Sequence, residues 1–199
     1  MSTFYTIESP VEGLYKEKGS KFLAFAYPVI SEQQVKDLQD ELRKKYYDAR
    51  HHCFAWVIGL EDQSWRANDD GEPAHSAGDP ILGQIKSNDL TNVLVVVIRY
   101  FGGTKLGVGG LINAYKTATE AALNKSTKKA IYETKRLVIR FTYDDMSVVE
   151  RLMTDFEIEV IKRDYQLECI LEASIKKDII SSFREKITDL YTIKFEFEE

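Results

Sequence analysis

The chain has 199 residues, 44% hydrophobic and 12% aromatic, a composition that excludes a disordered protein and provides for one large or two modest cores. No apolar run is long enough to span a membrane, and the start of the chain lacks the basic-then-apolar layout of a signal peptide. Two cysteines, Cys53 and Cys169, form no disulfide framework and no zinc spacing, so we expect a reduced, cytoplasmic protein without a membrane partner.

The net charge of −5 is unevenly distributed. Residues 1–130 carry 16 Lys+Arg and 16 Asp+Glu, whereas residues 131–199 carry 11 and 16. The second part therefore holds the whole excess of negative charge, which weakens bulk attraction to nucleic acid but leaves a local basic groove open in the first part.

The elements of residues 1–130 follow in chain order. Strand patterns cover 4–8, 13–16 and 21–29, and a helix begins after the N-cap Ser31. The run 51–59 is apolar on both faces, which predicts a central strand. A polar turn over 68–73, a short helix over 81–87, a strand over 93–98 and a helix ending near Lys125 complete this part.

A join near residues 126–130 separates two domains, 1–130 and 131–199. The second reads as strands over 137–143, 157–163, 166–174 and 191–197, with helices over 145–156 and 177–187. This strand–helix–strand–strand–helix–strand order is the ferredoxin-like pattern, so the fold class is α+β with two domains.

Five of the eleven glycines lie within nine residues, between the strand over 93–98 and the following helix: Gly102, Gly103, Gly107, Gly109 and Gly110. Such a loop can turn amide groups toward an anion, and Lys105 inside it is a ready cation. The spacing matches neither a Walker A motif nor a dinucleotide fingerprint. The loop thus either binds an anion or permits only tight turns and close packing.

Three carboxylates, Asp69, Asp70 and Glu72, occur within four residues. They are the oxygen ligands that Mg²⁺ prefers, although a solvated turn closed by Pro73 explains them equally. His75 is a further candidate contact, but the histidines lack the spacing of a metal site. Arg50, Arg66 and Arg99 flank the apolar strands and, with Lys105, form a phosphate-binding patch if they converge.

Four stretches together resemble the YigZ/IMPACT family over roughly residues 14–125. They are His51-His-Cys-Phe-Ala-Trp56, Asp69-Asp-Gly-Glu-Pro73, Ala77-Gly-Asp-Pro-Ile-Leu82 and the glycine-rich run from Arg99 to Leu111. The sequence departs from the family pattern at His75-Ser76, where the pattern has Gly-Thr, and at Asn113, where it has Arg.

The resemblance implies a first domain like domain 2 of ribosomal protein S5 and a second like domain V of elongation factor G. It also implies a link to translation, since eukaryotic relatives restrain an amino-acid-starvation kinase by competing for its activator. Bacteria lack that kinase, so that role does not transfer. Bacterial members have been labelled proline dipeptidases, but no set of metallopeptidase ligands is visible here.

The favoured hypothesis is a non-enzymatic, translation-linked regulator that binds RNA, the ribosome or a protein partner, with no catalytic residue, metal or cofactor assigned. Its binding residues would be Arg50, Arg66, Asp69, Asp70, Glu72, His75, Arg99, Lys105 and the five glycines of the loop. The alternative is a protein or enzyme for a phosphorylated or nucleotide ligand, in which the carboxylates hold Mg²⁺. A third hypothesis leaves the motifs structural and places function in the acidic second domain. Small-ligand binding gains support if the acidic turn and the glycine loop line one cleft.

Overall fold

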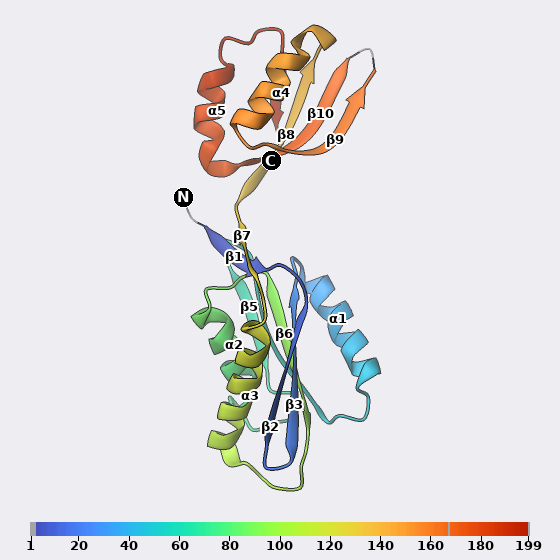
Figure 1. Ribbon diagram of the computed structural model, residues 1–199, viewed down its shortest axis with the longest axis vertical. Coiled ribbons are helices and arrows are strands. Elements are labelled where there is room, and N and C mark those ends of the chain that lie inside the picture. The colour runs from blue at the N-terminus through green and yellow to red at the C-terminus, as the bar shows by residue number, and fades with distance from the viewer. Residues whose placement is uncertain (1–2, 167, 199) are drawn as a thin grey trace. The chain divides into compact units, whose positions relative to one another are not determined.

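The computed structural model describes residues 3–166 and 168–198, which divide into two units, 3–131 and 132–198 (Figure 1). Leu167, inside the strand expected over 166–174, lies outside the described residues. Within the described residues, no helix combines the length and apolarity needed to cross a membrane.

The first unit is built on an antiparallel sheet of five strands in the order β2-β3-β6-β4-β5. These strands are β2 (Val11–Glu17), β3 (Ser20–Pro28), β4 (His51–Ile58), β5 (Ser64–Asn68) and β6 (Val93–Tyr100). The sheet centres on β6, an almost uninterrupted apolar run, because only a strand covered on both faces can bury such a run.

Helices cover both faces of this sheet: α2 (Gly78–Ser87) and α3 (Gly107–Leu123) lie on one face and α1 (Glu32–Lys45) on the other (Figure 1). Along β4, Cys53, Ala55 and Val57 join the core under α2 and α3, whereas Phe54 and Trp56 join the core under α1. The prediction of a central strand with two buried faces is confirmed, because alternate side chains of a strand point to opposite faces. Ser31 caps α1 as expected.

Two short strands escaped the sequence patterns. β7 (Lys128–Ile131) occupies the expected join and pairs antiparallel with β1 (Phe4–Ile7), and β5 is an edge strand with mainly exposed side chains. Neither strand shows the alternation of apolar residues that would have predicted it. Each is held by backbone pairing with a distant strand and buries little of its own side chains.

The second unit has its own sheet, in the antiparallel order β11-β8-β10-β9, and its own core. Its elements are β8 (Thr134–Phe141), α4 (Met146–Asp155), β9 (Glu159–Tyr165), β10 (Cys169–Lys176), α5 (Ile180–Ile187) and β11 (Lys194–Phe197). Strand order and connectivity are those of a ferredoxin-like domain, which confirms the expected α+β class.

Candidate functional site

At one end of the first unit, several loops lie together (Figure 1). The β6–α3 loop, which holds the glycines, meets the β2–β3 hairpin so closely that a Cβ on Gly102 would overlap the backbone of Gly19. The segment from Asp69 to Pro73 reaches the same end of the unit, since Glu72 accepts a hydrogen bond from Arg99, near the end of β6. The motifs that stand apart in the sequence thus form one surface.

Asp69 is committed to the start of α2. Its carboxylate accepts hydrogen bonds from the backbone N–H groups of His75, Ala77 and Gly78 at 2.8 to 2.9 Å. Burial by itself raises the pKa of Asp69, but these three donors outweigh it and hold the pKa below its ordinary value. The carboxylate therefore serves as the cap that α2 otherwise lacks.

Asp70 joins the turn to β4 and α1. It sits in the left-handed region at φ 40° and accepts from Arg43 at 2.9 Å and from the backbone N–H of His52 at 2.6 Å. Burial raises the pKa of Asp70, but the hydrogen bonds from Arg43 and from the His52 amide lower it by more, so the net shift is downward. This carboxylate is likewise occupied by the protein itself.

Glu72 is the centre of a buried polar network. Its Oε1 accepts from Arg99 Nη1 at 2.6 Å and from the Tyr115 hydroxyl at 2.8 Å, and the Cys53 thiol lies 3.3 Å from that hydroxyl. Only 4% of the Glu72 side chain and 7% of the Arg99 side chain are exposed. Burial raises the pKa of both Tyr115 and Cys53, so both are protonated donors at neutral pH.

Because of this network, two predicted site residues, Glu72 and Arg99, already bind each other. Arg99 is not a free surface cation, because Glu72 neutralises it, and breaking such a buried pair on one side leaves an uncompensated charge that costs about 3–5 kcal/mol. The three carboxylates of the turn bind three different partners. Among the described residues, no three His, Cys, Asp or Glu side chains gather as metal ligands do.

The glycines of the loop do not share one role. Gly102 has no room for a side chain and donates its N–H to Ser20, and a Cβ on Gly110 would crowd Leu106. Gly103 and Gly107 have positive φ angles of 88° and 72°. Gly109 has neither constraint, since a Cβ there would meet nothing within 4 Å. Packing and turn geometry therefore account for four of the five glycines and leave Gly109 unexplained.

The acidic turn and the glycine loop line one cleft. This hollow of about 400 Å³, here called the loop pocket, is bounded by Glu72, Pro73, Arg99, Phe101, Lys105, Leu106, Gly107, Val108 and Leu111. A second hollow of about 390 Å³, the edge pocket, is bounded by Asp48, Ala49, Arg50, His51, Arg99, Tyr100 and Phe101. Arg99 and Phe101 belong to both, so the two hollows adjoin.

Not every predicted residue reaches this place. Arg66 lies on β5 beside Trp56 and lines a separate hollow under α1. His75 is exposed and its Nδ1 lies 2.6 Å from Asp79. Asp69 and Asp70 support the turn without lining either pocket. Glu72, Arg99, Lys105, Gly107 and, in the edge pocket, Arg50 are the predicted residues that meet.

Two apolar walls of the loop pocket, Val108 and Leu111, were missed by the sequence reasoning. Val108 and Leu111 carry no signal of their own, since an apolar residue at the start of a helix is ordinary core composition. Phe101 had a signal, as an aromatic residue that follows a buried strand, and 56% of it is exposed. Exposure at a large aromatic residue is what marks it as a contact candidate.

Four exposed cations surround the two pockets. Arg50 and Lys105 line them, Lys18 precedes the glycine that touches Gly102, and Lys21 pairs with Tyr100 across the sheet. No carboxylate of the described chain lies within ion-pair distance of any of the four. We call Lys18, Lys21, Arg50 and Lys105 the basic rim.

The sequence and fold of the chain are similar to those of known proteins. Residues 18–123 match the Impact N-terminal domain, the part that contains both pockets. The chain is 30% identical over 191 residues to the IMPACT family member YigZ of Escherichia coli, covering 95% of this chain and 94% of that protein. It is also 30% identical to the IMPACT family member YvyE of Bacillus subtilis, covering all of this chain and 92% of that one.

A solved crystal structure of a protein described only as hypothetical superposes with a TM-score of 0.73 at 28% identity, covering all of this chain and 98% of the other. The domain match and the full-length relatives lead to one conclusion: this chain belongs to the IMPACT family.

Proposed function

We propose that this protein is a non-enzymatic regulator of translation that binds single-stranded RNA at the loop end of its first unit. The link to translation comes from the family resemblance. The choice of RNA over a protein partner comes from the local chemistry, in which the unpaired cations of the basic rim surround an exposed aromatic ring, Phe101.

The combination of free cations and an exposed aromatic ring is the observation that carries the proposal. Proteins that bind single strands hold the phosphates with Lys and Arg and stack bases on aromatic side chains. Tyr47, which precedes Asp48 of the edge pocket in the sequence, adds a second aromatic ring and is 84% exposed. Tyr100 is a weaker candidate because its hydroxyl donates to Asp48, which raises the pKa of Tyr100 to about 12 and holds the ring in place.

The alternative of a Mg²⁺-dependent ligand has less support. Asp69 and Asp70 are occupied by backbone amides and by Arg43, and Glu72 is occupied by Arg99 and Tyr115. A metal would have to displace these partners, at the cost of the α2 cap and of a buried ion pair.

The test is binding of the full-length protein to a fluorescently labelled single-stranded RNA of mixed sequence, followed by anisotropy over a salt series. The double variant Lys105→Ala/Arg50→Ala should lower the affinity about tenfold and flatten the dependence of log K on log salt by about one to two, since each lost phosphate contact removes roughly 0.7 from the slope.

Lys129→Ala is the matched control, because Lys129 is also exposed but lies on β7, at the other end of the first unit (Figure 1). Equal losses in both variants, or RNA binding unaffected by either, would place the contact elsewhere.

A further inference from the structure

Arg99 has one edge of its guanidinium group that the fold does not use. Its Nη1 donates to Glu72 Oε1 at 2.6 Å, and its central carbon lies over the rings of Phe22 and Phe101, each 5.5 Å away. Nε is buried without a hydrogen-bond partner in the described part of the chain, and Nη2 donates to no group there either. In the planar guanidinium, Nε–H and one N–H of Nη2 point the same way and form a fork of two donors.

An unused fork in this position indicates a ligand. Only 7% of the Arg99 side chain is exposed, and a donor buried this deeply is normally hydrogen-bonded. Arg99 lines both the loop pocket and the edge pocket, so a ligand in the adjoining hollows can supply the acceptor. Because the guanidinium is a permanent cation with donors only, the ligand that suits it carries the oxygen atoms of an anion.

The start of α3 brings further donors to the loop pocket. Leu106, Gly107 and Val108, which are the N-cap and the first two residues of this helix, line the pocket. Leu106 has no side-chain oxygen to cap the helix, and the first turn holds no acidic residue. The N–H groups of Gly107 and Val108 reach no acceptor of the described residues. The helix dipole places partial positive charge at these amides, so they attract the same kind of ligand as Arg99.

We propose that the Arg99 fork, the first amides of α3 and Lys105 together bind one phosphate group of the RNA strand. The proposal rests on the RNA binding proposed above and identifies the group that anchors the strand. A carboxylate has two oxygens, which the fork alone would occupy, whereas a phosphate has further oxygens for the amides and for Lys105. Glu72 lies on a different edge of the guanidinium, which separates its negative charge from that of the ligand.

The first experiment places a carboxylate where the phosphate would bind. Val108 is 52% exposed, and an acidic residue in the first turn favours a helix, so Val108→Asp should keep the fold. The new carboxylate should lower the affinity for orthophosphate at least about tenfold, because it takes the amides and repels the anion. Calorimetric titration of the full-length proteins at constant ionic strength measures the affinities.

Ile112→Asp is the matched control. It makes the same charge change one turn further along α3, at a residue that is 39% exposed and lines neither pocket. This variant should retain the affinity for orthophosphate.

Arg99→Lys tests the fork directly. Lysine keeps a positive charge for Glu72 but has no planar fork. The affinity for orthophosphate should fall about tenfold, in protein shown by thermal melting to be folded. The comparison of Val108→Asp with Ile112→Asp keeps the proposal testable if this variant does not fold.

Two labelled RNA decamers of one sequence, one with a terminal phosphate and one with a terminal hydroxyl, identify the source of the phosphate group. Tighter binding of the phosphorylated decamer would assign the end of a strand to the site. Equal binding of both decamers, weakened by Val108→Asp, would assign an internal phosphate.

The failures are distinguishable. Orthophosphate binding without binding of either decamer would overturn the proposed RNA binding and retain the phosphate site. Absence of saturable orthophosphate binding, or equal RNA affinities of Val108→Asp and Ile112→Asp, would overturn only the phosphate site.

Discussion

At the level of single residues, most charged groups of the family motifs are consumed by the fold. Asp69 caps α2, Asp70 joins β4 to α1, and Glu72 neutralises Arg99. What remains for a ligand is the basic rim, the exposed ring of Phe101 and the unused edge of Arg99. The charged residues of the family motifs therefore mainly stabilise the loops that carry the exposed cations and Phe101.

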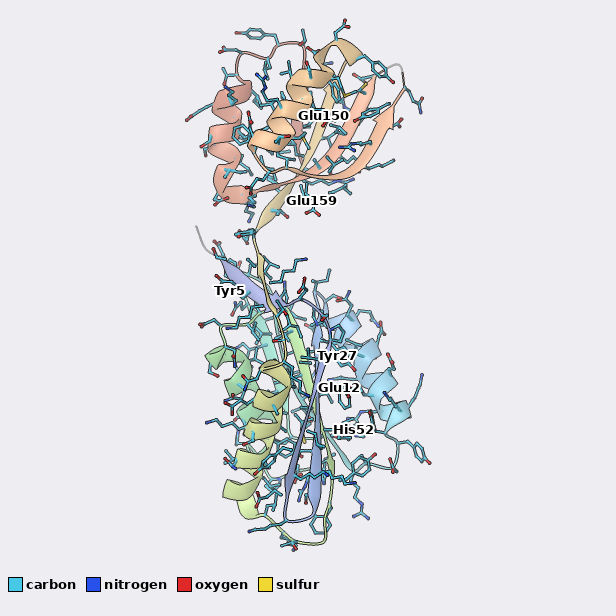
Figure 2. The ribbon with its side chains drawn as sticks, in the orientation of Figure 1. Tyr5, Glu12, Tyr27, His52, Glu150 and Glu159 are labelled. Carbon is cyan, nitrogen blue, oxygen red and sulfur yellow. The ribbon has the colours of Figure 1, made fainter. Side chains whose placement is uncertain are left out.

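His52 is a buried imidazole whose charged form the fold disfavours. It is buried on the α1 side of the sheet (Figure 2), and neither ring nitrogen has a hydrogen-bond partner within the described residues. Burial, then Arg43, lowers its pKa, while Asp70 at 4.0 Å from Nδ1 and the nearby backbone of Tyr46 only partly compensate, and His51 lowers it slightly further. The folded protein therefore keeps this imidazole neutral.

We predict that stability falls as the pH drops below the unfolded-state pKa of about 6.5, because the unfolded chain then binds a proton that the folded chain refuses. His52→Phe should remove this part of the pH dependence, so the variant should gain on the natural protein between pH 8 and pH 5.5. Urea unfolding at the two pH values measures the difference. A variant whose stability falls as steeply as that of the natural protein would contradict the prediction.

At the level of elements, the glycines of the β6–α3 loop differ in how closely the rest of the fold packs against them. Gly102 is fixed by the approach of the β2–β3 hairpin to the β6–α3 loop, whereas Gly109 lies in the first turn of α3 with open space above it. A glycine inside a helix costs roughly 0.5–1 kcal/mol relative to alanine, and no packing contact at Gly109 compensates that cost.

Gly109→Ala should therefore raise the stability by about 0.5–1 kcal/mol. Gly102→Ala should destabilise by about 1–3 kcal/mol, because the loop must move away from the hairpin. Thermal melting of the two variants gives both values. If Gly102→Ala is tolerated as well as Gly109→Ala, the close approach of the hairpin is not a constraint.

At the level of the whole molecule, the two units have separate cores and different net charges. The first unit is neutral in total and carries the basic rim, and residues 131–199 carry the charge of −5. β7 belongs to the first unit because it pairs with β1, so a boundary before residue 128 would remove a strand from its sheet.

A fragment ending at Ile131 should fold cooperatively, since its core is complete without the second unit. It should bind RNA at least as tightly as the full chain, because the deleted residues repel phosphate. Calorimetry and the anisotropy assay test the two statements. A folded fragment that has lost RNA binding would instead assign the contact to the second unit.

Much of the candidate site was within reach of the sequence. The family motifs indicated Glu72, Arg99, Lys105 and the glycines, and the apolar runs indicated the strands that carry them. Arg66 was equally plausible as a sequence signal, yet it lies on the opposite side of the sheet, under α1. Strand alternation within β5 could not show this, because the strand itself has no apolar pattern that reveals its register.

Local periodicity determined the central strands, the five helices and the ferredoxin-like order of the second unit, because apolar alternation and helical spacing are written into neighbouring residues. Only the tertiary structure decided that Glu72 and Arg99 meet, that β7 closes against β1, and that the acidic turn and the glycine loop enclose one pocket. Those contacts join residues far apart in the chain, and their register is set by packing across the sheet, which no local pattern encodes.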